Sequence, residues 1–108
     1  AEFKGKKVSL VCGIADPQSF ENLISSLGIG IELSLRFPDH HNYTQNDLKE
    51  VAHKSQEKNT ETIITTEKDA VRFYGLRITD YGLRVFVLCI KLEIIQYETF
   101  FNRIHSLF

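Results

Sequence analysis

The sequence contains no methionine, no tryptophan, two prolines and two cysteines among its 108 residues. Because it lacks a start methionine, we expect a piece of a longer protein, with residues 1–3 as a cloning remnant. Two cysteines cannot build a disulfide framework, and Cys12 and Cys89 each end an apolar run typical of a strand. We therefore expect buried, reduced thiols in a reducing compartment; a disulfide or a reactive thiol is the alternative.

Long apolar runs and an excess of one charge are also missing. No run approaches the roughly 20 apolar residues that a membrane span requires, and no signal peptide is visible. The formal net charge is −1, too small to attract nucleic acid or anionic lipid over the whole surface. The length, with 43% hydrophobic and 25% charged residues, is typical of one soluble domain spanning residues 1–108.

Four strand-like runs alternate with four helix-like segments. The expected strands cover residues 6–12, 29–37, 62–66 and 84–90, and the expected helices cover residues 17–27, 45–59, 67–73 and 97–108. This alternation predicts a small three-layer α/β sandwich with a mainly parallel four-stranded sheet flanked by helices. Residues 75–82 are expected to form a turn, and residues 91–96 either extend the last strand or add a short piece.

Local signals mark helix starts and buried faces. Asp16 is a suitable cap before Pro17, and Thr44 and Thr66 each have an aspartate three residues on. Apolar spacing predicts one buried stripe on the first helix, and alternation predicts that the second strand lies at an edge with one wetter face. The residues concerned are Phe20, Leu23, Ile24 and Leu27 in the helix and Ile31, Leu33 and Leu35 in the strand.

The loops that follow the strands carry most of the reactive side chains. In a parallel sheet the carboxyl ends of the strands lie at one edge, where ligand sites collect. Residues 12–16, 39–43 and 65–69 should therefore meet on one rim that holds carboxylates, two imidazoles, a lysine and hydroxyls. Helix capping alone explains Asp16, Thr44 and Thr66 about equally well, so both interpretations stay open for these residues.

Residues 37–44 (FPDHHNYT) concentrate the most chemistry. Histidine is a poor helix cap, whereas an imidazole titrates near neutral pH and suits proton transfer, so His40 and His41 suggest a working site. Adjacent side chains on an extended segment alternate in direction, so Asp39 and the two histidines cannot easily close on one metal ion. We expect no metal site. A Cys12–His40 nucleophile pair is a weaker alternative, because Cys12 has no evident orienting group.

Phosphate-binding loops are missing from the sequence. After Gly28 and Gly30, Leu33 stands where a dinucleotide fingerprint needs its third glycine, and no Gly-x-x-x-x-Gly-Lys-Ser/Thr loop occurs. The chain by itself is therefore not expected to bind ATP well.

Three motifs in register resemble one enzyme family. They are residues 5–28, with their CGIADP segment, Phe20 and Gly28; residues 37–48, with FPDHHNYT, Asp47 and Leu48; and residues 64–72 (ITTEKDAVR). Their order and spacing are similar to those of the C-terminal part of tetraacyldisaccharide 4′-kinases. Beyond Arg72 the tail carries no signature of that family.

The resemblance implies the C-terminal domain of a larger kinase in lipid A synthesis. Such enzymes transfer the γ-phosphate of ATP, with Mg²⁺, to the 4′-hydroxyl of a glucosamine disaccharide lipid at the cytoplasmic face of the Gram-negative inner membrane. The resemblance places the Walker loop and the membrane-associating element in an N-terminal domain outside this chain. The implied partners are that domain, the lipid A disaccharide precursor and, through the absent part, the membrane; the isolated chain is expected to be inactive.

The resemblance also implies roles for single residues. His40 is expected to pair with a carboxylate of the N-terminal domain in a dyad that activates the sugar hydroxyl, with Asp39 orienting the segment or lying near the metal–phosphate region. Candidates for the substrate or interdomain cleft are His41, Tyr43, Thr66, Glu67, Lys68 and Asp69. The last three could equally lock the strand–helix junction. Two other functions stay open, namely a lid or docking domain without chemistry and an independent ligand-binding domain.

Overall fold

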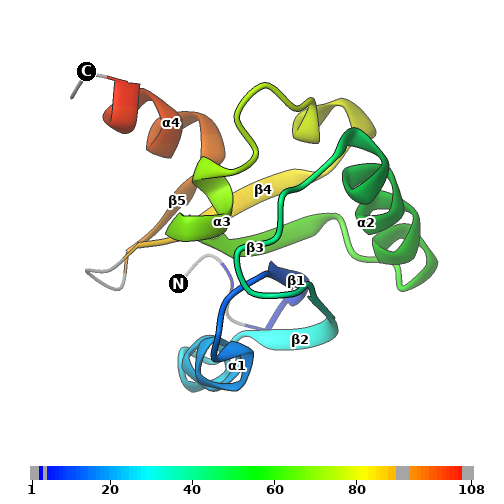
Figure 1. Ribbon diagram of the computed structural model, residues 1–108. Helices are drawn as coiled ribbons and strands as arrows, with labels where there is room; N and C mark the ends of the chain where they lie inside the picture. The colour runs from blue at the N-terminus through cyan, green and yellow to red at the C-terminus, as the bar shows by residue number, and fades with distance from the viewer. Residues whose placement is uncertain (1–2, 4, 90–92, 106–108) are drawn as a thin grey trace.

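Five strands form one mixed sheet in the computed structural model, which describes Phe3 and residues 5–89 and 93–105 (Figure 1). Its strand order is β2-β1-β3-β4-β5, with β1 (Lys7–Cys12), β2 (Gly30–Arg36), β3 (Thr62–Thr66), β4 (Arg84–Leu88) and β5 (Ile94–Gln96). The helices are α1 (Pro17–Ser26), α2 (Gln45–Glu57), α3 (Glu67–Val71), the 3-10 helix η1 (Ile78–Tyr81) and α4 (Tyr97–His105). Strands β2, β1, β3 and β4 are parallel, whereas β5 runs antiparallel to β4.

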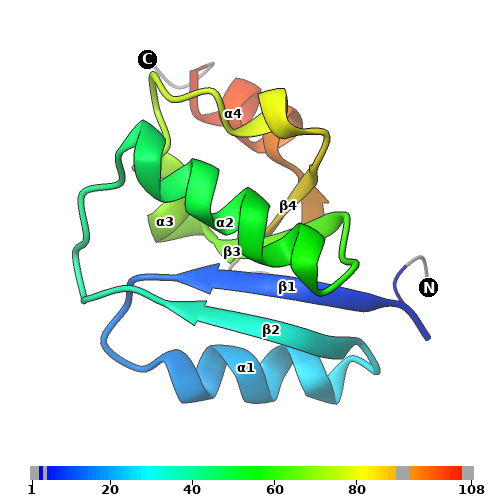
Figure 2. The same cartoon turned by 90° about the vertical axis from the view of Figure 1, so that its right-hand side faces the viewer.

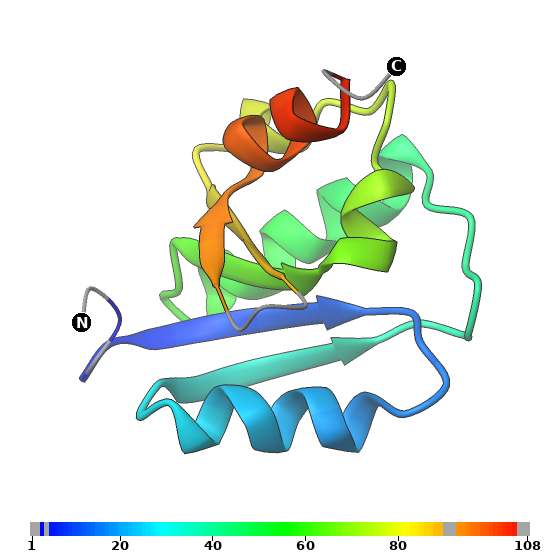
Figure 3. The same cartoon turned by 90° about the vertical axis from the view of Figure 1, so that its left-hand side faces the viewer.

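Helices cover both faces of the sheet, which confirms the predicted α/β layers. Helix α1 lies on one face, and α2, α3 and α4 lie on the other (Figures 2 and 3). The core is divided accordingly, because alternate strand residues point to opposite faces. The α1 side buries Val8, Leu10, Phe20, Ile24, Ile64 and Phe86, and the α2 side buries Val11, Leu48, Val51, Ile63, Phe73 and Val85.

The prediction of four strands is wrong by one. Strand β5 has three residues and turns back along β4, pairing Leu88 with Ile94 and Phe86 with Gln96. So short a segment shows no period in the sequence, although a short extra piece was one of the two alternatives for this region. The last parallel strand ends at Leu88; Ile90 and residues 91–92 lie outside the described residues.

Strand β2 is an edge strand, as predicted, but its alternation is interrupted. The pairing with β1 shifts register between Val8 and Ser9, a bulge that moves later residues to the opposite face. Ile31 therefore packs in the cluster under α1, whereas Leu35 packs in the cluster under α2. The expectation that both share one face is wrong for this reason.

Helix starts follow the predicted caps. Asp16, Thr44 and Thr66 each accept a hydrogen bond from the backbone N–H three residues on, at 3.1 Å. The expected stripe on α1 is too long by one residue, because Leu27 lies beyond the helix and is 41% exposed.

Other boundaries differ from the predicted ones. The helix predicted over residues 67–73 ends at Val71, and η1 occupies part of the expected turn over residues 75–82. Helix α4 is described to His105, so its predicted continuation to residue 108 lies outside the described residues. Among the residues described, no helix has the length and apolar character needed to cross a bilayer.

Candidate active site

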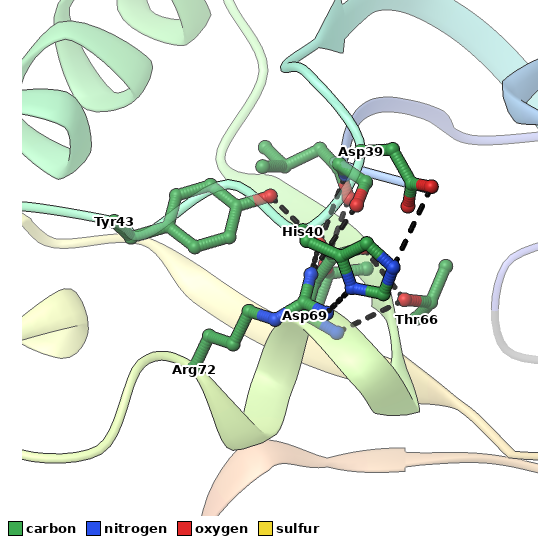
Figure 4. Close-up of polar contacts among 9 residues, drawn as sticks. Asp39, His40, Tyr43, Thr66, Asp69 and Arg72 are labelled. Carbon is green, nitrogen blue, oxygen red and sulfur yellow. Dashed lines mark hydrogen bonds and ion pairs between the residues drawn. The ribbon is translucent and has the colours of Figure 1, made fainter. Parts of the chain in front are cut away.

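Three loops meet at the carboxyl ends of β1, β3 and β2, as the predicted parallel sheet implied. The Gly13 N–H, after β1, donates to Asp69 Oδ1 of α3 at 2.9 Å, and the Tyr43 hydroxyl, after β2, donates to the same oxygen at 2.8 Å. These partners are 56 and 26 residues apart in the chain. Figure 4 shows the side chains of the rim converging on Asp69 and on the neighbouring Arg72.

Asp69 is the centre of this arrangement. Its side chain is fully buried, and the Thr66 hydroxyl donates to its second oxygen, Oδ2, at 2.6 Å. A buried carboxylate is stable only when its oxygens are hydrogen-bonded. Asp69 accepts from three donors in three segments, namely Gly13, Tyr43 and Thr66. Burial and the adjacent Asp69 carboxylate raise the pKa of the Tyr43 phenol, so this hydroxyl stays protonated and remains a donor at neutral pH.

Gly13 is the point at which the first loop touches the second. The His40 N–H donates to Gly13 O at 3.1 Å. A Cβ atom at Gly13 would lie 2.9 Å from the carbonyl oxygen of Pro38 and 3.1 Å from the Tyr43 hydroxyl. Both neighbours belong to the second loop; the first is a backbone atom, and the second is the hydroxyl that donates to Asp69.

Replacing Gly13 with alanine is expected to lower the free energy of unfolding by about 1–3 kcal/mol, the usual cost of overpacking. Urea unfolding followed by circular dichroism measures this loss. Gly30→Ala is the matched control, because its new Cβ would come no closer than 3.2 Å to another atom. A loss at Gly13 no larger than the loss at Gly30 would contradict the close contact between the loops.

His40 projects from the second loop into solvent. Its side chain is 76% exposed, and its backbone has a φ of +60°, a left-handed conformation that residues other than glycine adopt rarely. Arg72 Nη2 lies 2.9 Å from ring atom Nδ1, and Asp39 Oδ2 lies 3.6 Å from Nε2 (Figure 4). Backbone strain of this kind is held by the surrounding structure and clusters at functional sites.

His41 turns the other way and has a structural explanation. Its Nε2 lies 2.8 Å from Asp47 Oδ2, the same oxygen that accepts the Thr44 N–H at 2.9 Å in the capping box of α2. Its ring stacks on Phe37, with centroids 4.8 Å apart. The two adjacent histidines therefore serve different places, the rim and the start of α2.

A pocket of about 440 Å³ opens on the α1 side of the rim. Its walls are mainly apolar, and its lining residues are Ile14, Ala15, Asp16, Leu23, Thr66, Glu67, Lys68, Leu88 and Cys89. Of the predicted cleft residues, Thr66, Glu67 and Lys68 line this pocket. Tyr43 and Asp69 are buried in the hydrogen-bond network instead, and neither His40 nor Asp39 borders the pocket.

The two cysteines give little support to the alternative of a reactive thiol. Both cysteines are free; Cys12 is buried, whereas Cys89 is only half-buried and follows β4, so the expected burial holds for one thiol. Burial raises the pKa of the Cys12 thiol to about 11, so its thiolate is scarce at neutral pH, which disfavours a Cys12–His40 nucleophile pair.

Within the described part of the chain, no three acidic, histidine or cysteine side chains are grouped to hold a metal ion.

Comparison with known proteins decides the family. The family model described as tetraacyldisaccharide-1-P 4′-kinase matches residues 1–108. The chain belongs to this family. It is 41% identical over 99 residues to a tetraacyldisaccharide 4′-kinase of Desulfatibacillum aliphaticivorans, covering 92% of this chain and 26% of the relative. It is 34% identical over 96 residues to that of Halothermothrix orenii, covering 86% of this chain and 25% of the relative.

The chain thus spans about a quarter of the length of these tetraacyldisaccharide 4′-kinases. A third relative, from Bdellovibrio bacteriovorus, is 41% identical over 75 residues, or 69% of this chain and 22% of the relative. No solved structure matches the chain.

Two residues that the sequence left without a role stand out in this tetraacyldisaccharide 4′-kinase segment. Arg72 belongs to the third motif, yet only its spacing of three residues from Asp69 hinted at a contact. Gly13 belongs to the first motif, and its close approach to Pro38 depends on the packing of two distant loops. Both connect the buried network to the exposed His40.

Proposed function

We propose that this chain is the C-terminal domain of a lipid kinase that transfers the γ-phosphate of ATP to the 4′-hydroxyl of a lipid A disaccharide precursor. The match of the family model to residues 1–108 supports this, and the relatives are about four times as long. In this proposal an N-terminal domain holds ATP and Mg²⁺ and contacts the cytoplasmic face of the inner membrane. The present chain contributes one wall of the catalytic cleft.

His40 is the residue to which we assign a chemical role. The observation that carries this assignment is its exposed ring on a left-handed backbone that three neighbouring groups hold in place. In the reaction the 4′-oxygen forms a bond to the γ-phosphorus, the bond to the leaving ADP breaks, and the hydroxyl proton must go to a base. We assign that task to a dyad of His40 with a carboxylate of the N-terminal domain. Asp39, 45% exposed beside the ring, helps to orient it.

The remaining motif residues position this wall of the cleft. Tyr43 and Asp69 are enclosed and act through the loops they connect, and Thr66 connects the network to the pocket. Glu67 and Lys68 lie on the pocket side and are assigned to the interdomain cleft, where a lysine suits the anionic substrates of a kinase. His41 fixes the start of α2.

An NMR titration of the chain with Mg-ATP and with a disaccharide analogue tests the division of labour. We expect no saturable shifts, because the sequence holds no phosphate loop. Saturable binding of Mg-ATP would contradict the proposal and favour an independent ligand-binding domain. The full-length protein should phosphorylate the disaccharide, and a Walker loop should lie upstream of residue 1; failure of either would contradict the kinase assignment.

A rigid lid without chemistry is the second candidate. The enclosed Asp69 network favours it, since such a network stiffens the loops that would close over a partner domain. The two candidates differ in whether loss of His40 removes activity without loss of stability.

A further inference from the structure

Arg72 is the only side chain in the described residues with a hydrogen bond to the ring of His40. It stands at the end of α3 and is 23% exposed. Its Nη2 lies 2.9 Å from His40 Nδ1, its Nη1 donates to Gly13 O at 3.3 Å, and the same Nη1 lies 3.9 Å from Asp69 Oδ1. The guanidinium thus joins the buried carboxylate to the exposed imidazole (Figure 4).

The chemistry of the two groups fixes which atom carries the hydrogen. A guanidinium has only N–H donors and keeps its proton in proteins, so Nδ1 of His40 must be the acceptor. A neutral imidazole with an unprotonated Nδ1 carries its hydrogen on Nε2. The contact with Arg72 therefore exists only while Nδ1 lacks a proton, and the nitrogen exposed to a partner is then an N–H donor.

We propose that Arg72 is a positioning residue that holds His40 in the tautomer with its hydrogen on Nε2. For its catalytic consequence this inference rests on the proposed function. A ring in this state offers a hydrogen to a facing carboxylate or substrate oxygen, and has no free lone pair there to take the proton of the sugar hydroxyl. Within the dyad the proton then goes to the carboxylate, which the Nε2–H orients.

The groups around the ring agree with this tautomer. Asp39 Oδ2, 3.6 Å from Nε2, accepts hydrogen bonds when ionised and faces the nitrogen that carries the hydrogen. The backbone N–H of His40 is bound to Gly13 O, the atom that also accepts from Arg72. Backbone and ring are therefore both fixed against the first loop, which Asp69 secures.

The first test is a long-range ¹H–¹⁵N NMR spectrum of the histidine rings in the wild-type chain. For the neutral ring of His40 we expect separate signals, one for an unprotonated Nδ1 and one for a protonated Nε2. His53 is the internal reference for a neighbouring carboxylate without the arginine, because its ring is 68% exposed and Glu57 Oε1 lies 3.5 Å from its Nε2, and we expect its shifts to be averaged between tautomers. A protonated Nδ1 in His40, or averaged shifts like those of His53, would overturn the proposal.

Variants of Arg72 give the second arm of this test. In Arg72→Met the His40 shifts should move to those of His53, and in Arg72→Lys they should remain partly separated. Arg77→Met is the matched control, since Arg77 also pairs with an aspartate three residues away but lies directly before η1 and is 81% exposed. Unchanged His40 shifts in Arg72→Met, with the His41 signals of a folded chain, would overturn the role of Arg72.

A double-mutant cycle in the full-length kinase tests the catalytic consequence. Arg72→Met should lower kcat roughly tenfold, the size typical of residues that orient a functional side chain. In a His40→Ala background the same change should lower kcat by less than about twofold, because Arg72 acts through the ring that His40→Ala has already removed. Independent effects would contradict positioning through His40. Full activity of His40→Ala would instead contradict the proposed function. The tautomer of His40 would not be affected by that result, because the NMR spectrum tests it independently.

Discussion

Replacing Asp69 with alanine is expected to lower the free energy of unfolding of the chain by roughly 3–5 kcal/mol. The substitution removes the acceptor of the Gly13 N–H, the Tyr43 hydroxyl and the Thr66 hydroxyl. Leaving a buried donor unsatisfied costs about 1–3 kcal/mol, and two of these donors belong to segments far from Asp69 in sequence. Domains of this size are stable by only about 5–15 kcal/mol, so the loss should be a large fraction of the total.

Urea unfolding followed by circular dichroism measures the loss, with Asp80→Ala as the matched control. Asp80 is also an aspartate three residues from an arginine, but it is 55% exposed. Its replacement should lower the free energy of unfolding by less than about 0.5 kcal/mol. Asp69→Asn keeps the size and one acceptor oxygen, so its effect should fall between the two. A loss for Asp69→Ala within about 1 kcal/mol of that for Asp80→Ala would contradict the role of the network.

The alternation of strands and helices could be predicted from the sequence because its signals are local. Caps at Asp16, Thr44 and Thr66 act within three residues, β4 holds a continuous apolar run, and β3 is a short segment rich in β-branched residues. From the sequence, a short piece such as β5 was only one of two alternatives, because three residues paired to β4 show no pattern of their own. The bulge in β2 was equally hidden, since it is a property of the pairing with β1.

The convergence of the three loops followed from the parallel order of the strands, but their connections did not. Asp69 reads as a first-turn acidic residue of α3, and nothing local shows that it is buried or that it binds Gly13 and Tyr43. The contact between Arg72 and His40 spans 32 residues and depends on where the second loop settles against the first. The different positions of His40 and His41 could not be predicted either, because they depend on the direction in which each ring points in the folded chain.

Replacing His40 with alanine in the full-length kinase is expected to lower kcat by about 10²- to 10⁴-fold, the usual contribution of a positioned acid–base group. In the proposed mechanism, the substitution removes the ring that orients the carboxylate of the partner domain at the sugar hydroxyl. Stability should change by about 1 kcal/mol or less, because the side chain is 76% exposed. Substrate KM should change little, since the ring is assigned to the reacting hydroxyl and not to holding the lipid.

His53→Ala is the control for this substitution. It removes the same side chain from an exposed position, 68% accessible on α2 and away from the rim, and should leave both kcat and stability unchanged. If the domain were only a lid, loss of activity in His40→Ala would accompany loss of stability or of contact between the domains.

The most direct measurement is therefore kcat of the His40→Ala kinase, determined beside the urea midpoint of the same variant. A role for His40 in the chemistry predicts a fall in kcat of at least about 100-fold with a midpoint close to that of the wild-type enzyme. Wild-type activity in the variant, or a loss of activity that is matched by loss of stability, would contradict it.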